Sequence, residues 1–415
     1  MAYTERQLGK LLAHTAQTRP LVYLNGPRQV GKSTLAQHVA TNKEIDYISF
    51  DSPLTLAAAK SDPTRFVQSM QPDKLNIIDE VQMLPEAFRL FKMSIDEHRG
   101  KGDEAGLYLL TGSADIFALP GLAQALVGRM SILTLLPFSS AEIRGTGKNF
   151  IESLWKEQPC RRKYEDVNLV EVISDATYPE IALNRQVKRK QWFDDYLTTI
   201  LQRDVKTLAD IRNPNNIVQL LVSLSQRVGS LLNNASVTKE TGLDAKTYAK
   251  YKGLLNNTFL TFEIEPWSKP NKLNKRFVKQ SKLYFNDTGL LCYIMRRDIT
   301  DIYKNDSSAM GHIFENFIAT EIMKNAAALE GVSVAHFNLS GGKEVDFVLE
   351  NASGETVGIE AKLDCALSDR DFANMRILRD MLGDRFKKGV IIYAGTEQVP
   401  FRDDMWAVPV NYLWE

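Results

Sequence analysis

The chain has 415 residues, of which 44% are hydrophobic and 25% are charged, and its 51 basic and 51 acidic side chains cancel. This length exceeds what one hydrophobic core supports, so roughly two to four domains are expected. The balanced charge excludes a globally basic nucleic-acid binder, and any such site must be a local patch. Three scattered cysteines indicate neither a disulfide framework nor a zinc site. With no membrane-length apolar stretch and no signal-peptide core, a cytoplasmic protein without a membrane partner is expected.

Helical spacing over residues 4–18 leads into the sequence GPRQVGKS at 26–33, which matches the phosphate-binding pattern G-x-x-x-x-G-K-[ST]. The runs 21–24 and 34–40 on either side predict the strand and the helix that this pattern requires. Glycines let the loop turn and point N–H groups at phosphates, Lys32 would reach the β- and γ-phosphates of ATP, and Ser33 would bind Mg²⁺. The alternative is a chance glycine turn. The predicted nucleotide contacts are Gly26, Pro27, Arg28, Gln29, Val30, Gly31, Lys32, Ser33 and Thr34.

Two more strands are predicted at 45–50 and 74–78, and the second ends in two adjacent carboxylates. Beside a phosphate loop, Asp79 would hold Mg²⁺ through its water shell. Glu80 would orient and deprotonate the attacking water. The alternative is that both acids are a solvated strand end.

A strand predicted at 106–110 ends in Thr111-Gly112-Ser113, a position where a small hydroxyl can sense the γ-phosphate. We assign this role to Ser113, with capping of the next helix as the equal alternative. Arg129 precedes a further predicted strand and can neutralise transition-state charge in its own or a neighbouring subunit, which leaves a homo-oligomer open. The alternative is a structural arginine.

These motifs, GPRQVGKS, IIDE with the following VQMLP, LLTGS and LVGR with LLPFSSAE, resemble the bacterial and archaeal AAA+-like ATPases of the AAA_14/DUF4143 architecture. The resemblance continues through TYPE at 177–180, LQRDV at 201–205, residues 275–291, residues 311–322 and EVDFVLE at 344–350. It departs at 176–177, where the family commonly has paired glycines, so a nucleotide contact by that segment is in doubt.

The resemblance implies a multidomain α/β protein whose C-terminal domain is related to the PD-(D/E)XK nucleases. We divide the chain into a P-loop ATPase domain with a parallel sheet (1–150), a helical lid or connector (151–208), a winged helix (209–268) and the DUF4143 nuclease-like domain (269–415). In the winged-helix region, two helices around a glycine turn are followed by strand-like residues. Lys246 and Lys250 on its second helix can approach DNA, although many winged helices only space proteins apart.

Residues 266–285 carry six basic and no acidic side chains among several aromatic rings, which is typical of a surface that binds a nucleic-acid backbone. The alternative is a solvated face. With the winged helix, this run favours DNA over RNA as partner. The six residues are Lys269, Lys272, Lys275, Arg276, Lys279 and Lys282.

The last third of the chain predicts a second metal site. Asp346 and Glu360 lie on two strands that a turn at 351–354 would pair, and Lys362 shares the face of Glu360. Two carboxylates that bind Mg²⁺ or Mn²⁺, with a lysine beside the attacking water, suit phosphodiester hydrolysis. Glu315, on a predicted helix, would add a further acid, whereas we interpret the nearby His312 as a helix-start residue. The alternative is a domain that binds without cutting.

Together these patterns predict a Mg²⁺-dependent ATPase that couples its nucleotide state to nucleic-acid binding and to metal-dependent cleavage. One alternative is a signal-transducing ATPase whose C-terminal domain is a non-catalytic DNA- or protein-binding module. Another is a ring-forming motor that acts on protein, against which the basic run at 266–285 argues.

Overall fold

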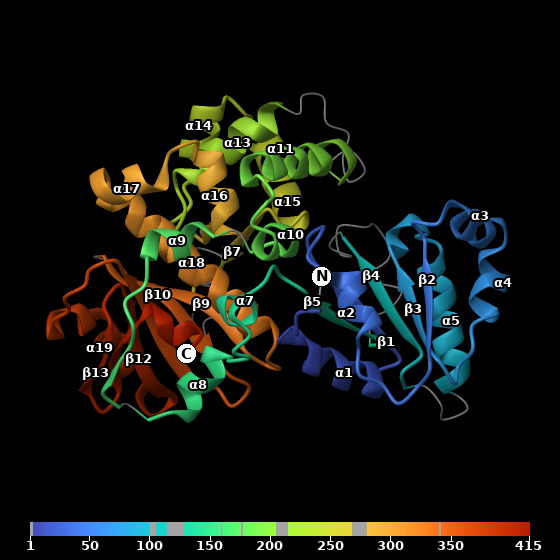
Figure 1. Cartoon of the computed structure of the whole chain (residues 1–415), viewed down its shortest axis with the longest axis horizontal. Coiled ribbons are helices and arrows are strands. Elements are labelled where there is room, and N and C mark those ends of the chain that lie inside the picture. Colours follow the sequence, from blue (N-terminus) through green and yellow to red (C-terminus); the bar gives the residue numbers. More distant parts are fainter. Residues whose placement is uncertain are drawn as a thin grey trace.

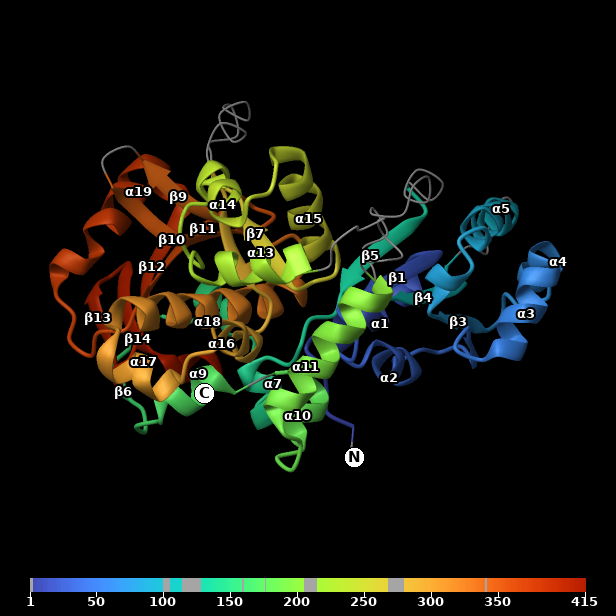
Figure 2. The same ribbon diagram turned by 90° about the horizontal axis from the view of Figure 1, so that it is seen from above.

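The computed structural model describes residues 3–99, 105–113, 128–158, 160–175, 177–204, 215–267, 280–339 and 342–415. Figure 1 shows a blue N-terminal sheet on one side and an orange-to-red C-terminal sheet on the other, with green and yellow helices above and between them. Seen from above in Figure 2, helices α11 and α10 lie between the middle helices and the N-terminal sheet.

The N-terminal sheet is parallel and has the strand order β2-β3-β4-β1-β5. Its central strands are buried along their whole length, because helices cover both faces of such a sheet. The strands are β1 (Leu21–Asn25), β2 (Ile45–Ser49), β3 (Leu75–Asp79), β4 (Tyr108–Gly112) and β5 (Met130–Thr134). The helices are α1 (Leu8–Thr18), α2 (Lys32–Gln37), α3 (Pro53–Ser61), α4 (Pro63–Gln68) and α5 (Ala87–Arg99). This arrangement confirms the predicted P-loop fold.

A connecting region follows the sheet and reaches both halves of the molecule. A capping box between Ser139 and Glu142 starts its first helix. Its helices are α7 (Ser140–Arg144), α8 (Phe150–Lys156), α9 (Leu169–Ser174), α10 (Pro179–Leu183) and α11 (Arg189–Thr199), and a π-helical turn covers Ile200–Asp204. The short strand β6 (Arg162–Lys163) leaves this region and joins the C-terminal sheet.

The middle region contains a helix-turn-helix. Helix α14 ends at Gly242, whose φ of 68° suits a residue without a side chain, and Asp244 caps the next helix by accepting from the Lys246 and Thr247 backbones. The helices are α13 (Asn215–Ser225), α14 (Asn234–Thr241), α15 (Ala245–Asn257), α16 (Thr288–Met295) and α17 (Ile299–Asn305). A two-stranded antiparallel sheet joins β7 (Thr261–Ile264) to β8 (Lys282–Phe285), so these paired strands lie on opposite sides of the boundary that we predicted between 268 and 269.

The C-terminal region runs in the order helix, three strands, helix and three strands. It forms a sheet with the order β6-β13-β14-β12-β11-β10-β9, in which β10 pairs antiparallel with β11 and β11 pairs parallel with β12. Its helices are α18 (Ser307–Ala327) and α19 (Ala373–Leu382). Its strands are β9 (Ser333–Leu339), β10 (Lys343–Glu350), β11 (Thr356–Lys362), β12 (Phe386–Tyr393), β13 (Glu397–Arg402) and β14 (Met405–Pro409).

One buried hydrophobic cluster extends through both halves, and each half also has a smaller cluster of its own. The largest buried cluster runs from Leu8 in α1 to Trp414 at the C-terminus. Across it, both carboxylate oxygens of the fully buried Glu321 on α18 accept from the Ser140 backbone N–H, at 3.1 and 3.0 Å. Among the helices of the described ranges, we find none that combines the length and the apolar character of a membrane span.

Candidate functional site

The phosphate loop has the backbone that its glycines predict. Gly26 and Gly31 have φ values of 144° and 90°, and a side-chain carbon at Gly26 would lie 2.1 Å from the Leu135 carbonyl oxygen. The buried Arg6 also stabilises the loop. It donates to the Val30 carbonyl at 2.9 Å and to Glu142 at 3.1 Å. The sequence analysis missed Arg6, since no motif marks it.

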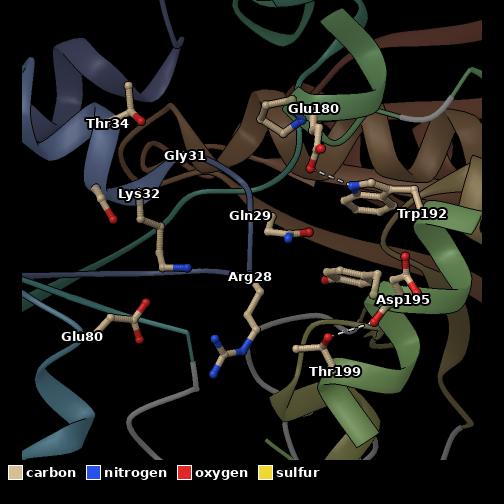
Figure 3. Close-up of a pocket in the computed structure, with 13 residues that line it drawn as sticks. Arg28, Gln29, Gly31, Lys32, Thr34, Glu80, Glu180, Trp192, Asp195 and Thr199 are labelled. Carbon is tan, nitrogen blue, oxygen red and sulfur yellow. Dashed lines mark hydrogen bonds between the residues drawn. The ribbon is translucent and has the colours of Figure 1, made fainter. Parts of the chain in front are cut away.

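Lys32 and Glu80 face each other across the floor of the site (Figure 3). Lys32 is only 5% exposed, and its ammonium donates to the carbonyls of Gly26 at 3.0 Å and Pro27 at 2.7 Å. Its aliphatic stem is therefore packed, and its charge lies inside the loop where a phosphate would be bound.

The predicted Mg²⁺ ligands are assembled. The Ser33 hydroxyl donates to Asp79 Oδ1 at 2.9 Å, and the Tyr47 hydroxyl donates to Asp79 Oδ2 at 2.8 Å. Thr111 also donates to Oδ1. A hydroxyl and a carboxylate at this separation are hard oxygen donors of the kind that Mg²⁺ binds, so Ser33 and Asp79 fit the ion that accompanies ATP.

Glu80, which the sequence predicts to be a general base, follows directly after β3. Its φ of 57° turns the chain sharply after β3, and its backbone N–H donates to Thr111 Oγ1 at 3.3 Å. The Gln82 side chain donates to its carboxylate. Burial raises the pKa of Glu80, while the charges of Lys32 and Arg28 partly oppose that rise. A carboxylate with a raised pKa accepts a proton more readily.

The opposite wall of the site comes from α10 and α11, which the sequence analysis assigned only as a lid. The loop and these helices enclose a pocket of about 760 Å³. Trp192 donates from Nε1 to Glu180 at 2.9 Å and stacks on Tyr196 with ring centroids 4.9 Å apart. Pro179 and Glu180 of the TYPE motif line this pocket. The motif therefore lies beside the phosphate loop even though paired glycines do not precede it. The wall adds Pro179, Glu180, Trp192, Asp195, Tyr196 and Thr199 to the predicted contacts.

Two predicted residues lie away from the pocket floor. Ser113 accepts from Gln82 at 3.3 Å, whereas Thr111 is the hydroxyl that contacts Asp79. Arg129 precedes β5, whose first residue pairs with Leu21, so it lies at the edge of the sheet opposite the phosphate loop. There it forms an ion pair with Asp96 at 2.5 Å. A role for Arg129 at the γ-phosphate of its own subunit is therefore wrong, and one in a neighbouring subunit stays a prediction.

The C-terminal acids also converge, but on a lysine. The Lys282 ammonium from β8 lies 2.9 Å from Glu315 of α18, and 2.5 and 3.1 Å from Glu344 and Asp346 of β10. Lys282 is only 2% exposed, so the prediction that it contacts nucleic acid from the protein surface is wrong. Burial alone would lower its pKa, but the carboxylates raise that pKa above its ordinary value.

Glu360 and Lys362 lie beside this cluster without joining it. Glu360 is 7% exposed and its Oε1 has no hydrogen-bond partner; burial and the Asp346 charge raise its pKa to about 8. Burial and Asp346 likewise raise the pKa of Glu315 to about 7. Lys362 forms an ion pair with Asp371 at 3.0 Å. Within the described ranges, no three His, Cys, Asp or Glu side chains are grouped to hold a metal ion, so this arrangement does not fit the predicted Mg²⁺ or Mn²⁺.

Apart from Lys282, the predicted nucleic-acid residues fall into two groups. Lys246 and Lys250 are exposed on α15. The other five, Lys269, Lys272, Lys275, Arg276 and Lys279, lie outside the described residues.

Comparison with known families agrees with the geometry. Residues 18–172 match the AAA domain model AAA_14, 168–316 match a domain of unknown function, DUF8612, and 310–413 match another, DUF4143. The N-terminal half is an AAA-type P-loop ATPase. The ATPase carries a DUF4143 domain at its C-terminal end, as the sequence predicted.

The relatives of this ATPase include uncharacterized proteins of Mycobacterium tuberculosis and Mycobacterium bovis. Each is 24% identical over 416 residues, covering 100% of this chain and 85% of the relative. A Walker-type ATPase of Pyrococcus abyssi is similar in structure, with 15% identity, a TM-score of 0.43 and coverage of 71% of this chain and 96% of its own. The Aeropyrum pernix ORC1 protein in complex with DNA has 11% identity, a TM-score of 0.29 and coverage of 73% and 95%.

Proposed function

We propose that this ATPase is a nucleotide-controlled DNA-binding switch. The observation that carries the proposal is the shared pocket, in which the phosphate loop forms one wall and α10–α11 form the other. Nucleotide bound there touches both walls, so its phosphate state would bias where α11 lies.

Helix α11 is connected to the helix-turn-helix through packed side chains. Phe193 of α11 packs on Tyr293 of α16 with ring centroids 5.5 Å apart, and the Tyr293 hydroxyl donates to Asp194. Helix α16 in turn packs against α13, and α13 against α14. A displacement of α11 can therefore be passed to the unit that would bind DNA.

The DNA-binding part of the proposal rests on α15. Lys246 and Lys250 are exposed on this helix, while Tyr248 is buried beneath them. The second helix of a helix-turn-helix enters the major groove and its lysines neutralise phosphates.

The hydrolytic step follows from the loop residues. Loop N–H groups and Lys32 would bind the phosphates, and Ser33 and Asp79 would hold Mg²⁺, which supplies charge neutralisation when bound. Glu80, oriented by Gln82, accepts the proton of the attacking water. Thr111 fixes both acids, through Asp79 Oδ1 and the Glu80 backbone.

The experiment measures the fluorescence anisotropy of labelled duplex DNA with ATP, with ADP and without nucleotide. We expect nucleotide-dependent affinity in the wild type, loss of that dependence in Lys32→Ala, and weaker, less salt-dependent binding in Lys246→Glu/Lys250→Glu. Lys60→Glu/Lys74→Glu, two lysines of the ATPase domain, is the control with the same charge change. Equal binding by the α15 variant and its control would exclude α15 as the DNA surface.

A metal-dependent nuclease is the second candidate, because Glu315 and Asp346 converge in the C-terminal domain with Glu360 close enough to feel the Asp346 charge, and a metal ion would have to displace Lys282 from these acids. Its test is cleavage of single-stranded, double-stranded and branched DNA or RNA with Mg²⁺ or Mn²⁺. Cutting that Lys362→Ala abolishes while ATP hydrolysis persists would establish it. No cutting of any substrate would remove it.

A further inference from the structure

The acidic cluster of the DUF4143 domain contains a cation of its own. We propose that the Lys282 ammonium takes the place of a divalent metal ion in this cluster, so that the domain is held as a non-cutting scaffold attached to the middle region. This inference rests on the proposed function, a nucleotide-controlled switch that requires no cleavage by the C-terminal domain.

The hydrogen-bonding capacity of the lysine matches its surroundings. An ammonium has three N–H donors, and three carboxylates lie within reach, at 2.5 Å (Glu344), 2.9 Å (Glu315) and 3.1 Å (Asp346). The second oxygen of Asp346 accepts from the Ala361 backbone N–H at 3.1 Å, and the Tyr284 hydroxyl donates to Glu315 at 2.7 Å. Both Asp346 oxygens and Glu315 Oε1 are therefore already engaged, whereas Glu360 Oε1 is not.

Charge leads to the same conclusion. A divalent ion bound by Asp346 and Glu360 would lie close to a buried positive charge, and two cations in a region of low dielectric repel each other strongly. Metal could bind only if Lys282 left the cluster.

The backbone around Lys282 resists that departure. Lys282 pairs with Ile264 in the β7–β8 sheet, and Leu283 and Ser281 on either side accept from the N–H groups of Gly229 and Leu232 at 3.1 and 3.0 Å. Gly229 itself lies against Glu315, since a side-chain carbon there would be 2.9 Å from a carboxylate oxygen. Middle-region backbone thus holds both the lysine and one of its acids in place.

The experiment measures the thermal unfolding of the full-length protein without nucleotide, with and without millimolar Mn²⁺ or Mg²⁺. Every variant carries Asp79→Asn, so that the phosphate-loop site does not contribute. We expect metal to leave the Asp79→Asn parent unchanged. Lys282→Met should lower the melting temperature by roughly 5 °C or more, because it leaves buried carboxylates unbalanced, and metal should restore part of the loss.

Two further variants locate the effect. Adding Asp346→Asn to Lys282→Met should abolish the recovery by metal. Lys324→Met is the matched control, because Lys324 is also buried and ion-paired, at 3.4 Å to Glu321 alone. It should lose stability without recovery by metal. If Lys282→Met does not fold, Lys282→Met/Glu344→Gln, which removes one charge of each sign, takes its place.

The proposal fails if metal stabilises the Asp79→Asn parent through Asp346, because the cluster would then hold a metal with Lys282 present. It also fails if Lys282→Met is as stable as its parent and unaffected by metal. Neither outcome bears on nucleotide-dependent DNA binding, which the anisotropy experiment measures separately.

Discussion

The Thr111 hydroxyl connects Asp79 to Glu80, since it donates to the Asp79 carboxylate and accepts from the Glu80 backbone N–H. We therefore predict that Thr111→Val lowers the kcat of ATP hydrolysis by about 10-fold or more, as for other residues that orient metal ligands. Thr111→Ser keeps the hydroxyl and should retain most activity, whereas Ser113→Ala, which loses only a contact to Gln82, should change kcat little. Steady-state kinetics measures the kcat of the three variants. A larger loss of kcat in Ser113→Ala than in Thr111→Val would contradict the prediction.

Glu80 is the residue whose protonation should limit turnover in acid. Burial raises its pKa, and only the ionised carboxylate can accept a proton, so kcat should fall as the pH drops through that raised value, above the ordinary range for glutamate. Glu80→Gln should bind ATP but lose turnover by roughly 10²–10⁴-fold at neutral pH. A kcat–pH profile checks the wild type, and a Glu80→Gln enzyme with normal turnover would exclude the role.

At this scale, local sequence predicted the phosphate loop, Asp79 and Glu80, because each function lies within a few consecutive residues. Lys282 shows why the rest escaped. Its three acids come from a helix and a strand more than thirty residues away, and no spacing rule brings β8 beside them. A basic residue in a basic run was therefore assigned to the surface.

Helix α11 is the element on which the proposed switch depends. Trp192 forms part of its pocket wall through the hydrogen bond to Glu180 and the stacking on Tyr196. We predict that Trp192→Ala weakens ATP binding by about tenfold, whereas Trp192→Phe, which keeps a ring but not the N–H, loses less. Equilibrium binding of a fluorescent ATP analogue checks this, and unchanged affinity in Trp192→Ala would show that the wall does not contact the nucleotide.

The elements themselves were largely predictable, since continuous apolar runs mark the buried strands of the ATPase sheet. The surroundings of α11 were not predictable. Its residues have the mixed polarity of a surface helix, and only tertiary packing decides that one side lines the pocket while Phe193 reaches α16.

The whole molecule should lose its nucleotide site and its C-terminal fold together, because one buried cluster runs through both. All five tryptophans lie at residue 155 or beyond, so their fluorescence reports on the lid, the middle region and the C-terminal region, whereas ATP binding reports on the phosphate loop. We predict that urea abolishes both signals at the same midpoint. Two separate midpoints would show that the halves unfold independently. The sequence predicted separate domains, and this shared core, built from contacts between distant segments, had no local signal.

Strand β6 has a consequence for how the protein is made. Lys163 pairs with Glu397, which the ribosome adds 234 residues later (397 − 163). At elongation rates of about 5–20 residues per second, that interval is on the order of 10–50 s. During that interval the ATPase domain is already synthesised, but β6 has no partner strand and its backbone N–H and C=O groups stay unpaired. A chaperone that binds nascent chains would protect this edge, and translational pausing after residue 163 should lengthen its exposure and favour aggregation.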